Sequence, residues 1–157
     1  MSKKLEAGDT APEFHLPDDR GGTLSLADFA GKKLVLYFYP KDDTSGCTKE
    51  AIDLNGLKGD FDKAGTNILG VSPDSVASHV KFKTKHKLDL ALGSDETKAM
   101  LETYGVWVEK SMYGRKYMGV ERTTFLIGPD GKIAKIWRKV KVPGHAEAVL
   151  EAARALA

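Results

Sequence analysis

The sequence contains one cysteine among its 157 residues, Cys47. A single thiol excludes an internal disulfide, a Cys-x-x-Cys redox pair and a structural zinc site built from several thiolates. A lone cysteine is most often a small buried hydrophobic residue, so a claim that it reacts has to rest on its neighbours.

Long apolar runs and a large excess of one charge are also absent. No segment approaches the roughly 20 apolar residues of a membrane-spanning helix, and the basic residues in 1–14 precede no apolar run of a secretory signal. The 24 Lys and Arg against 22 Asp and Glu give a formal charge of +2. We therefore expect a cytoplasmic protein that needs neither a membrane nor nucleic acid as a partner, and we attribute the basic residues of 132–141 to strand-edge protection.

Histidine is scarce as well. The four histidines show no ligand-like clustering in the sequence: His15, His79, His86 and His145. No Gly-rich phosphate loop accompanies a predicted helix. We expect no metal and no cofactor.

What the sequence does contain is an ordered set of α and β signals. With 41% hydrophobic and 29% charged residues, the chain suits one globular domain over 1–157. A short hairpin is expected over 14–26, and the apolar run 34–39 reads as a strand covered on both faces. Helical spacing then continues to Gly65, and 67–72 is the next strand. Strand, helix and strand form a βαβ unit with parallel strands.

The second half of the chain has a different order. It is expected to contain helices at 75–88 and 95–104, a strand at 88–92, a hairpin of 123–127 with 132–137, and a helix from about Ala146. A parallel βαβ half followed by an antiparallel ββα half is the thioredoxin-type arrangement. The predicted fold is therefore α/β: a central mixed β-sheet flanked by helices, with an N-terminal β-hairpin.

The position of Cys47 argues for reactivity. It follows the polar loop between the 34–39 strand and the first long helix, and so lies in that helix's first turn. Unpaired backbone N–H groups and the positive end of the helix dipole favour an anion there, and the thiolate is the nucleophilic form of cysteine. The carboxyl ends of parallel strands are also where open α/β sheets hold their sites.

The residues around Cys47 carry a family resemblance. Pro40, Thr44 and Cys47 have the spacing Pro-x-x-x-Thr-x-x-Cys, which resembles the active-site signature of the peroxiredoxins. The string Phe-Tyr-Pro-Lys-Asp-Asp-Thr-x-Gly-Cys-Thr-x-Glu over 38–50 is similar to the bacterioferritin comigratory protein (PrxQ) branch. The resemblance runs nearly end to end, from Gly-Asp-x-Ala-Pro-x-Phe at 8–14 to Val-Glu-Arg-Thr-Thr-Phe-Leu-Ile at 120–127.

The resemblance implies a thiol-dependent peroxidase that reduces hydrogen peroxide and organic hydroperoxides, in antioxidant defence and redox homeostasis. Cys47 would attack the terminal peroxide oxygen and become a sulfenic acid. Thr44 would bond a peroxide oxygen, and Pro40 would shape the pocket wall and shield the sulfur.

Three further residues receive supporting or charge-stabilising roles. Arg122 opens the 123–127 strand, and in this fold the start of that strand lies beside the first helix's N-terminus. A guanidinium there would hold the thiolate and stabilise charge on the departing oxygen. Glu50 either orients Arg122 or is an ordinary acid in a first helical turn. Gly46 belongs to the same string.

The sequence departs from the family pattern at two kinds of position. Ser45 stands where the branch commonly has proline, which would change loop stiffness. A resolving cysteine is missing five residues after the nucleophile, where Ile52 stands, and also near 82–84. We therefore expect a one-cysteine peroxiredoxin, monomeric and recycled by an external thiol such as thioredoxin, a glutaredoxin or glutathione.

Two other functions fit parts of the sequence. A thiol–disulfide reductase is disfavoured because Glu50 stands where a second thiol belongs. A non-catalytic thioredoxin-like binding module, with an inert Cys47, does not account for Thr44 and Arg122 occurring together.

Overall fold

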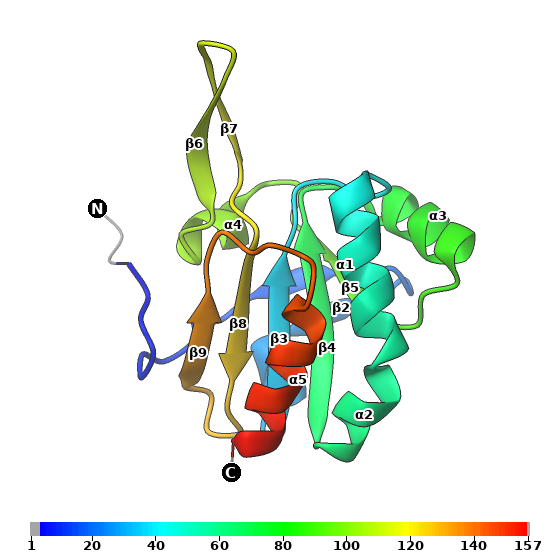
Figure 1. The fold of residues 1–157 in the computed structure, drawn as a ribbon, viewed down its shortest axis with the longest axis vertical. Coiled ribbons are helices and arrows are strands. Elements are labelled where there is room, and N and C mark those ends of the chain that lie inside the picture. The colour runs from blue at the N-terminus through cyan, green and yellow to red at the C-terminus, as the bar shows by residue number, and fades with distance from the viewer. Residues whose placement is uncertain (1–3, 157) are drawn as a thin grey trace.

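The computed structural model describes residues 4–156, so 1–3 of the leading segment and residue 157 lie outside it. At its centre is a five-stranded sheet in the order β5-β4-β3-β8-β9 (Figure 1). The strands are β3 (Lys33–Phe38), β4 (Thr66–Ser72), β5 (Ala91–Ser94), β8 (Thr123–Ile127) and β9 (Ile133–Trp137). β3, β4 and β5 are parallel, whereas β8 runs antiparallel to β3 and to β9. This mixed sheet confirms the predicted fold class.

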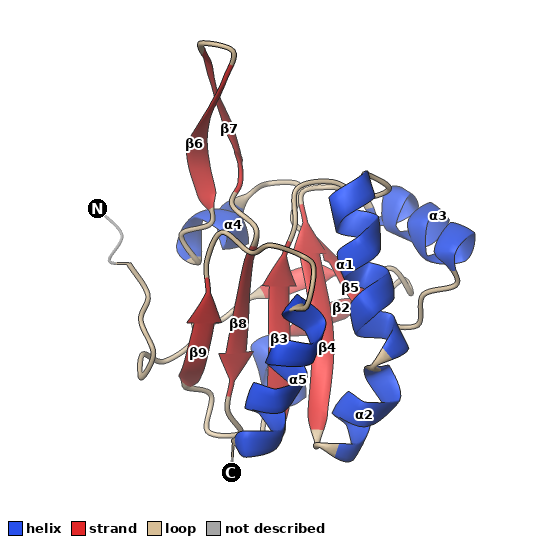
Figure 2. Cartoon of the chain, viewed as in Figure 1, coloured by secondary structure: helices blue, strands red, loops and turns tan. Residues whose placement is uncertain are grey.

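Helices and a small hairpin cover the two faces of the sheet. The helices are α1 (Ser45–Gly56), α2 (Lys58–Lys63), α3 (Val76–His86), α4 (Ala99–Thr103) and α5 (His145–Ala155). In Figure 2, α1, α2 and α5 lie in front of the sheet. The predicted N-terminal hairpin is present as β1 (His15–Pro17) and β2 (Thr23–Ser25), followed by a 3-10 turn at Leu26–Phe29. Within residues 4–156, every helix is too short or too polar to cross a bilayer.

The β3 strand forms the middle of two cores. Val35 and Tyr37 face the cluster that contains Leu54 of α1, while Leu36 faces the cluster that contains Phe125 of β8. All five of these residues are fully buried. The continuous apolar run is explained by this double coverage, because neither face of the strand meets water.

The helix predicted to run to Gly65 is interrupted. α1 ends at Gly56, and Leu57 adopts φ −100° and ψ 5° before α2 begins at Lys58. Glycine weakens a helix interior, and the bend lets Phe61 reach the same buried cluster as Leu54.

The strand predicted at 88–92 is wrong by about three residues, because β5 is Ala91–Ser94. The Asn55 side-chain oxygen accepts hydrogen bonds from the backbone N–H groups of Asp89 (2.7 Å) and Leu90 (3.3 Å). A side chain thus occupies backbone donors that the pattern had assigned to a sheet.

The helix predicted at 95–104 is shorter than expected. The Asp95 carboxylate accepts the backbone N–H of Leu101 at 2.8 Å, and Lys98 takes a left-handed conformation with φ 65°. Residues 95–98 therefore form a turn before α4 starts at Ala99.

A second hairpin, β6 (Trp107–Met112) with β7 (Arg115–Val120), was not predicted. It projects away from the sheet at the edge where β3 ends, as Figure 1 shows. At its base, Glu121 N–H donates to Val106 O at 2.8 Å, so the hairpin's two ends are pinned together just before Arg122.

Candidate active site

Two elements meet at the edge of the sheet that carries the site. The N-terminal end of α1 and the start of β8 both lie at the upper edge in Figure 1, where β3 ends. Cys47 is the third residue of α1, and Arg122 directly precedes β8. The first intrahelical hydrogen bond is donated by Thr48 N–H to Thr44 O at 2.8 Å, so the amides of residues 45–47 face the helix entrance.

Cys47 is buried but not in wholly apolar surroundings. It is 2% exposed and belongs to the core cluster that includes Tyr37 and Ala51. Its Sγ accepts a hydrogen bond from Arg122 Nη2 at 3.3 Å. The sequence prediction that a guanidinium converges on this sulfur is thus matched by the geometry, although 75 residues separate the two in the chain.

The guanidinium of Arg122 makes hydrogen bonds to two residues. Nη1 donates to Glu50 Oε1 at 2.6 Å, while Nη2 donates to Cys47. Burial opposes the charge on Arg122, but Glu50 and Cys47 outweigh it and raise the pKa of the guanidinium. Burial is also the main cause that raises the pKa of Glu50 to about 7, against the opposing influence of Arg122. The predicted contact between Glu50 and Arg122 is present.

Gly46 lets the guanidinium lie against the backbone of α1. A Cβ at this position would stand 3.2 Å from Arg122 Nη2. A side chain on residue 46 would therefore crowd the guanidinium, which would have to shift by a few tenths of an ångström.

Thr44 and Pro40 lie in the loop that leads to Cys47. Thr44 is the N-cap residue of α1, and its hydroxyl donates to Lys41 O at 2.8 Å. With its hydrogen used in this way, the exposed oxygen presents lone pairs that can accept a hydrogen bond from a hydroperoxide. Pro40 is half-buried at the carboxyl end of β3.

The site contains a tyrosine that the sequence analysis assigned only to the core. The hydroxyl of Tyr37 and Oε2 of Glu50 are buried without a hydrogen-bond partner among residues 4–156. Burial, then Glu50, then Cys47 raise the pKa of Tyr37 well above its ordinary value, which places this phenol in the field of the site. A Cβ at Gly70 would stand 2.7 Å from the Tyr37 hydroxyl, so the glycine makes room for it. Within an apolar run, nothing marks such a tyrosine as different from a packing residue.

Two histidines make buried polar contacts that their positions in the sequence did not reveal. His145, at the start of α5, shares a hydrogen bond of 2.9 Å with the Thr124 hydroxyl. Burial, assisted by Arg122, lowers the pKa of His145 to about 4. His79 is not isolated either, because it lies with Asp42 and Asp74 in a group whose polar atoms are all within 4.8 Å of one another.

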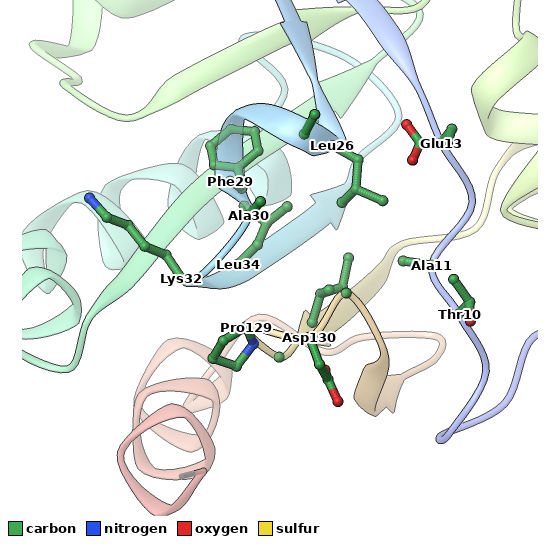
Figure 3. Close-up of a pocket in the computed structure, with 14 residues that line it drawn as sticks. Thr10, Ala11, Glu13, Leu26, Phe29, Ala30, Lys32, Leu34, Pro129 and Asp130 are labelled. Carbon is green, nitrogen blue, oxygen red and sulfur yellow. The ribbon is translucent and has the colours of Figure 1, made fainter.

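An apolar pocket of about 340 Å³ lies at the other end of the sheet (Figure 3). Its lining includes Leu34 near the start of β3, Ile127 at the end of β8, and Phe29. Cys47 follows the opposite end of β3, so this pocket is separate from the thiol site.

Comparisons with known proteins agree with this geometry. Residues 7–136 match the model of the AhpC/TSA family. The chain is 51% identical over 147 residues to Peroxiredoxin Bcp of Xanthomonas campestris, covering 92% of both chains, and 46% identical over 147 residues to Peroxiredoxin Bcp of Bacillus subtilis, covering 94% of both.

Solved structures give the same result. A Xylella fastidiosa PrxQ mutant has a TM-score of 0.93 at 40% identity, with 98% of each chain covered. Xanthomonas campestris Peroxiredoxin Q has a TM-score of 0.87 at 49% identity, with 90% of each chain covered. Structures of two different cysteine-to-serine mutants show that this relative has at least two cysteines, whereas the present chain has one. The chain therefore belongs to the AhpC/TSA family, as a peroxiredoxin of the Bcp, or PrxQ, type.

Proposed function

We propose that this thiol peroxidase reduces hydrogen peroxide and small organic hydroperoxides at Cys47, and that an external thiol restores it. The observation that carries the assignment is the 3.3 Å hydrogen bond from Arg122 Nη2 to Cys47 Sγ at the entrance to α1. A guanidinium and a helix N-terminus both stabilise the thiolate, which is the attacking form.

The oxidation step is a two-electron transfer. The Cys47 thiolate attacks the terminal peroxide oxygen, a sulfur–oxygen bond forms, and the oxygen–oxygen bond breaks. The departing alkoxide or hydroxide takes up a proton and leaves as an alcohol or water, while the sulfur becomes a sulfenic acid. Arg122 stabilises the negative charge that grows on the departing oxygen, and Thr44 aligns the substrate by accepting its O–H.

The reset step needs two external thiol equivalents. The first thiol condenses with the sulfenic acid to give a mixed disulfide and water, and the second releases the Cys47 thiol and an external disulfide. No second cysteine exists in this chain to do the first step. The reductant we propose is thioredoxin, a glutaredoxin or glutathione, which also suits the reducing cytoplasm. We further propose that the chain acts as one monomeric domain, which sedimentation at several concentrations will test.

The decisive experiment adds about one equivalent of hydrogen peroxide to the reduced chain and traps sulfenic acid for mass spectrometry. Rapid, near-stoichiometric modification at Cys47 is the expected result. Oxidation no faster than that of free cysteine would instead identify a non-catalytic binding module. Turnover with each of the three thiols then separates the candidate reductants.

A further inference from the structure

A buried polar cluster holds the loop that leads from β3 to α1. Asp42, in the loop between β3 and α1, is 7% exposed. Its carboxylate accepts hydrogen bonds from the Tyr39 hydroxyl at 2.6 Å, the Ser78 hydroxyl at 2.8 Å and His79 Nδ1 at 2.7 Å. Ser78 and His79 belong to α3, so this carboxylate joins the active-site loop to a different helix.

The surroundings of His79 require it to carry a charge. Nδ1 faces the Asp42 carboxylate, and Nε2 faces the backbone carbonyl of Gly93 at 2.9 Å. Both partners are acceptors, so both ring nitrogens must donate, and only the imidazolium form has two N–H groups. Burial disfavours this charge, but the Asp42 carboxylate and the Gly93 carbonyl outweigh burial and raise the pKa of His79.

Among the titratable groups near His79, we expect His79 itself to be the one whose protonation changes with pH. Asp74, which follows β4, adds negative charge that favours the imidazolium. Tyr39 lies 3.4 Å from Nδ1, and burial raises its pKa well above its ordinary value, so it stays neutral. On α3, Lys83 pairs with Asp19 at 2.8 Å, and Lys85 pairs with Asp43 at 2.7 Å.

The backbone of the loop is held by the same cluster. Asp42 N–H donates to Asp74 Oδ2 at 2.8 Å, and the Ser72 hydroxyl donates to the same oxygen at 2.6 Å. Two residues after Asp42, Thr44 stands at the N-cap position of α1, and its hydroxyl donates to Lys41 O. The loop that leads to Thr44 and Cys47 is therefore held by contacts with residues at the end of β4 and on α3.

We propose that His79 is a positioning residue, whose buried ion pair with Asp42 holds the 41–44 loop so that Thr44 and Cys47 meet the peroxide correctly. This inference rests on the proposed function. The imidazolium stabilises the loop fully below the ordinary pKa of histidine, 6.5, and that stabilisation disappears as the pH rises through the raised value of His79. Loss of the proton at high pH leaves His79 with one N–H for its two acceptors, Asp42 and the Gly93 carbonyl. It also removes the positive charge that pairs with Asp42, so the loop is held less firmly.

The test compares His79→Gln with a matched control, His86→Gln. His86 lies on the same helix and contacts Asp43, the next residue of the same loop, at 2.8 Å, but this pair is exposed. The second-order rate constant with hydrogen peroxide is measured from pH 5.5 to 9.5. The wild type is expected to lose rate on the alkaline side. His79→Gln is expected to be about tenfold to a hundredfold slower at neutral pH and to lack that alkaline decline, while His86→Gln stays within about twofold of wild type.

Amide hydrogen exchange over 41–48 gives a readout that does not need catalysis. Exchange in His79→Gln is expected to be faster than in wild type at pH 7, after correction for the intrinsic rate. If the variant exchanges faster than wild type but the wild-type chain does not react with peroxide, the peroxidase assignment is wrong and the loop contact still stands. A His79→Gln variant with the rate, pH profile and protection of wild type would overturn the positioning role.

Nitrogen NMR of the His79 imidazole tests the ion pair in the wild-type protein. This measurement therefore does not depend on whether the variant folds. At pH 7, both ring nitrogens of His79 are expected to be protonated. A neutral His79 ring at that pH would contradict the ion pair directly.

Discussion

Arg122 is the residue on which the site's electrostatics converge. It donates hydrogen bonds to the buried Glu50 and the buried Cys47 through different nitrogens of one guanidinium. The planar fork of arginine reaches two acceptors in this way, whereas a lysine ammonium is a single point charge. The residue-scale predictions follow from this division.

Replacing Arg122 with alanine should slow peroxide reduction by about a hundredfold or more, the scale for losing one charge-stabilising donor. Arg122→Lys should fall between alanine and wild type, because it restores charge without the fork. Stopped-flow oxidation of Cys47 measures both. Arg138→Ala is the matched control, since Arg138 is also partly buried but donates to Leu5 O at 2.6 Å. Wild-type kinetics in Arg122→Ala would remove this residue from the mechanism.

Replacing Cys47 with serine should abolish peroxidase turnover and leave the fold intact. Oxygen and sulfur differ little in size, and the serine hydroxyl can still accept the Arg122 hydrogen bond, so the expected stability change is about 1 kcal/mol or less. Thermal unfolding and a coupled peroxide assay check the two halves separately. Residual turnover would place the chemistry elsewhere.

Glu50 should make stability depend on pH. Its folded pKa of about 7 lies above its ordinary value of 4.5, so between these values the folded chain holds a proton that the unfolded chain has released. The contribution is complete below pH 4.5 and is lost as the pH rises through 7, an effect on the order of 3 kcal/mol. Glu50→Gln, which mimics the protonated form, should therefore gain stability relative to wild type as the pH rises from 5 to 8. Urea unfolding at four pH values tests this, and a pH-independent difference would refute it.

At the scale of elements, the clear periodic signals were predicted well. The 34–39 run, the βαβ unit and the 123–127 with 132–137 hairpin are all present close to their expected bounds. Errors arose where a side chain competes with the pattern. Asn55 occupies the amides of Asp89 and Leu90, and Asp95 holds the turn before α4. Such long-range hydrogen bonds leave no periodic signature.

The β6–β7 hairpin was missed for a different reason. Its two-residue turn, Tyr113 and Gly114, has φ values of 53° and 78°, which is the type I′ geometry normally marked by Asn-Gly. A tyrosine in the left-handed region is unusual, so the turn carries no ordinary signal.

This turn yields a stability prediction. Tyr113 is 99% exposed, so its ring contributes no burial. Tyr113→Asn should raise the free energy of unfolding by about 0.5–1 kcal/mol, because asparagine adopts the left-handed conformation at lower cost. Denaturant unfolding is the measurement. Tyr117→Asn, within β7, is the control and should give no gain, because asparagine is disfavoured in strands. Equal effects at both positions would contradict the turn argument.

At the scale of the whole molecule, the site combines residues that sequence order keeps apart. The motif around Cys47 was recognisable as a unit, and the fold explained why Arg122 should join it. The burial that gives Glu50 its raised pKa and encloses Tyr37 could not be predicted, because it depends on packing between α1, β3 and β8. The His79 and Asp42 pair stayed hidden because its partners are 37 residues apart.

The absence of a second thiol sets the molecule's response to excess oxidant. Without an external thiol, Cys47 sulfenic acid has no thiol of its own chain to meet, so further peroxide should carry it to sulfinic acid and permanent inactivation. Intact mass spectrometry should show one, then two added oxygen atoms as peroxide increases. With excess thiol present, the second addition should be suppressed. A protein that stays at one added oxygen in many equivalents of peroxide would contradict this expectation.

The near-complete enclosure of Cys47, with 2% of its surface open, limits how other molecules reach the sulfur. We expect a small hydroperoxide to reach this sulfur more readily than a thiol carried on another protein, which would need the first turn of α1 to open. Oxidation and reduction of Cys47 are then expected to take place in two different conformations of this segment.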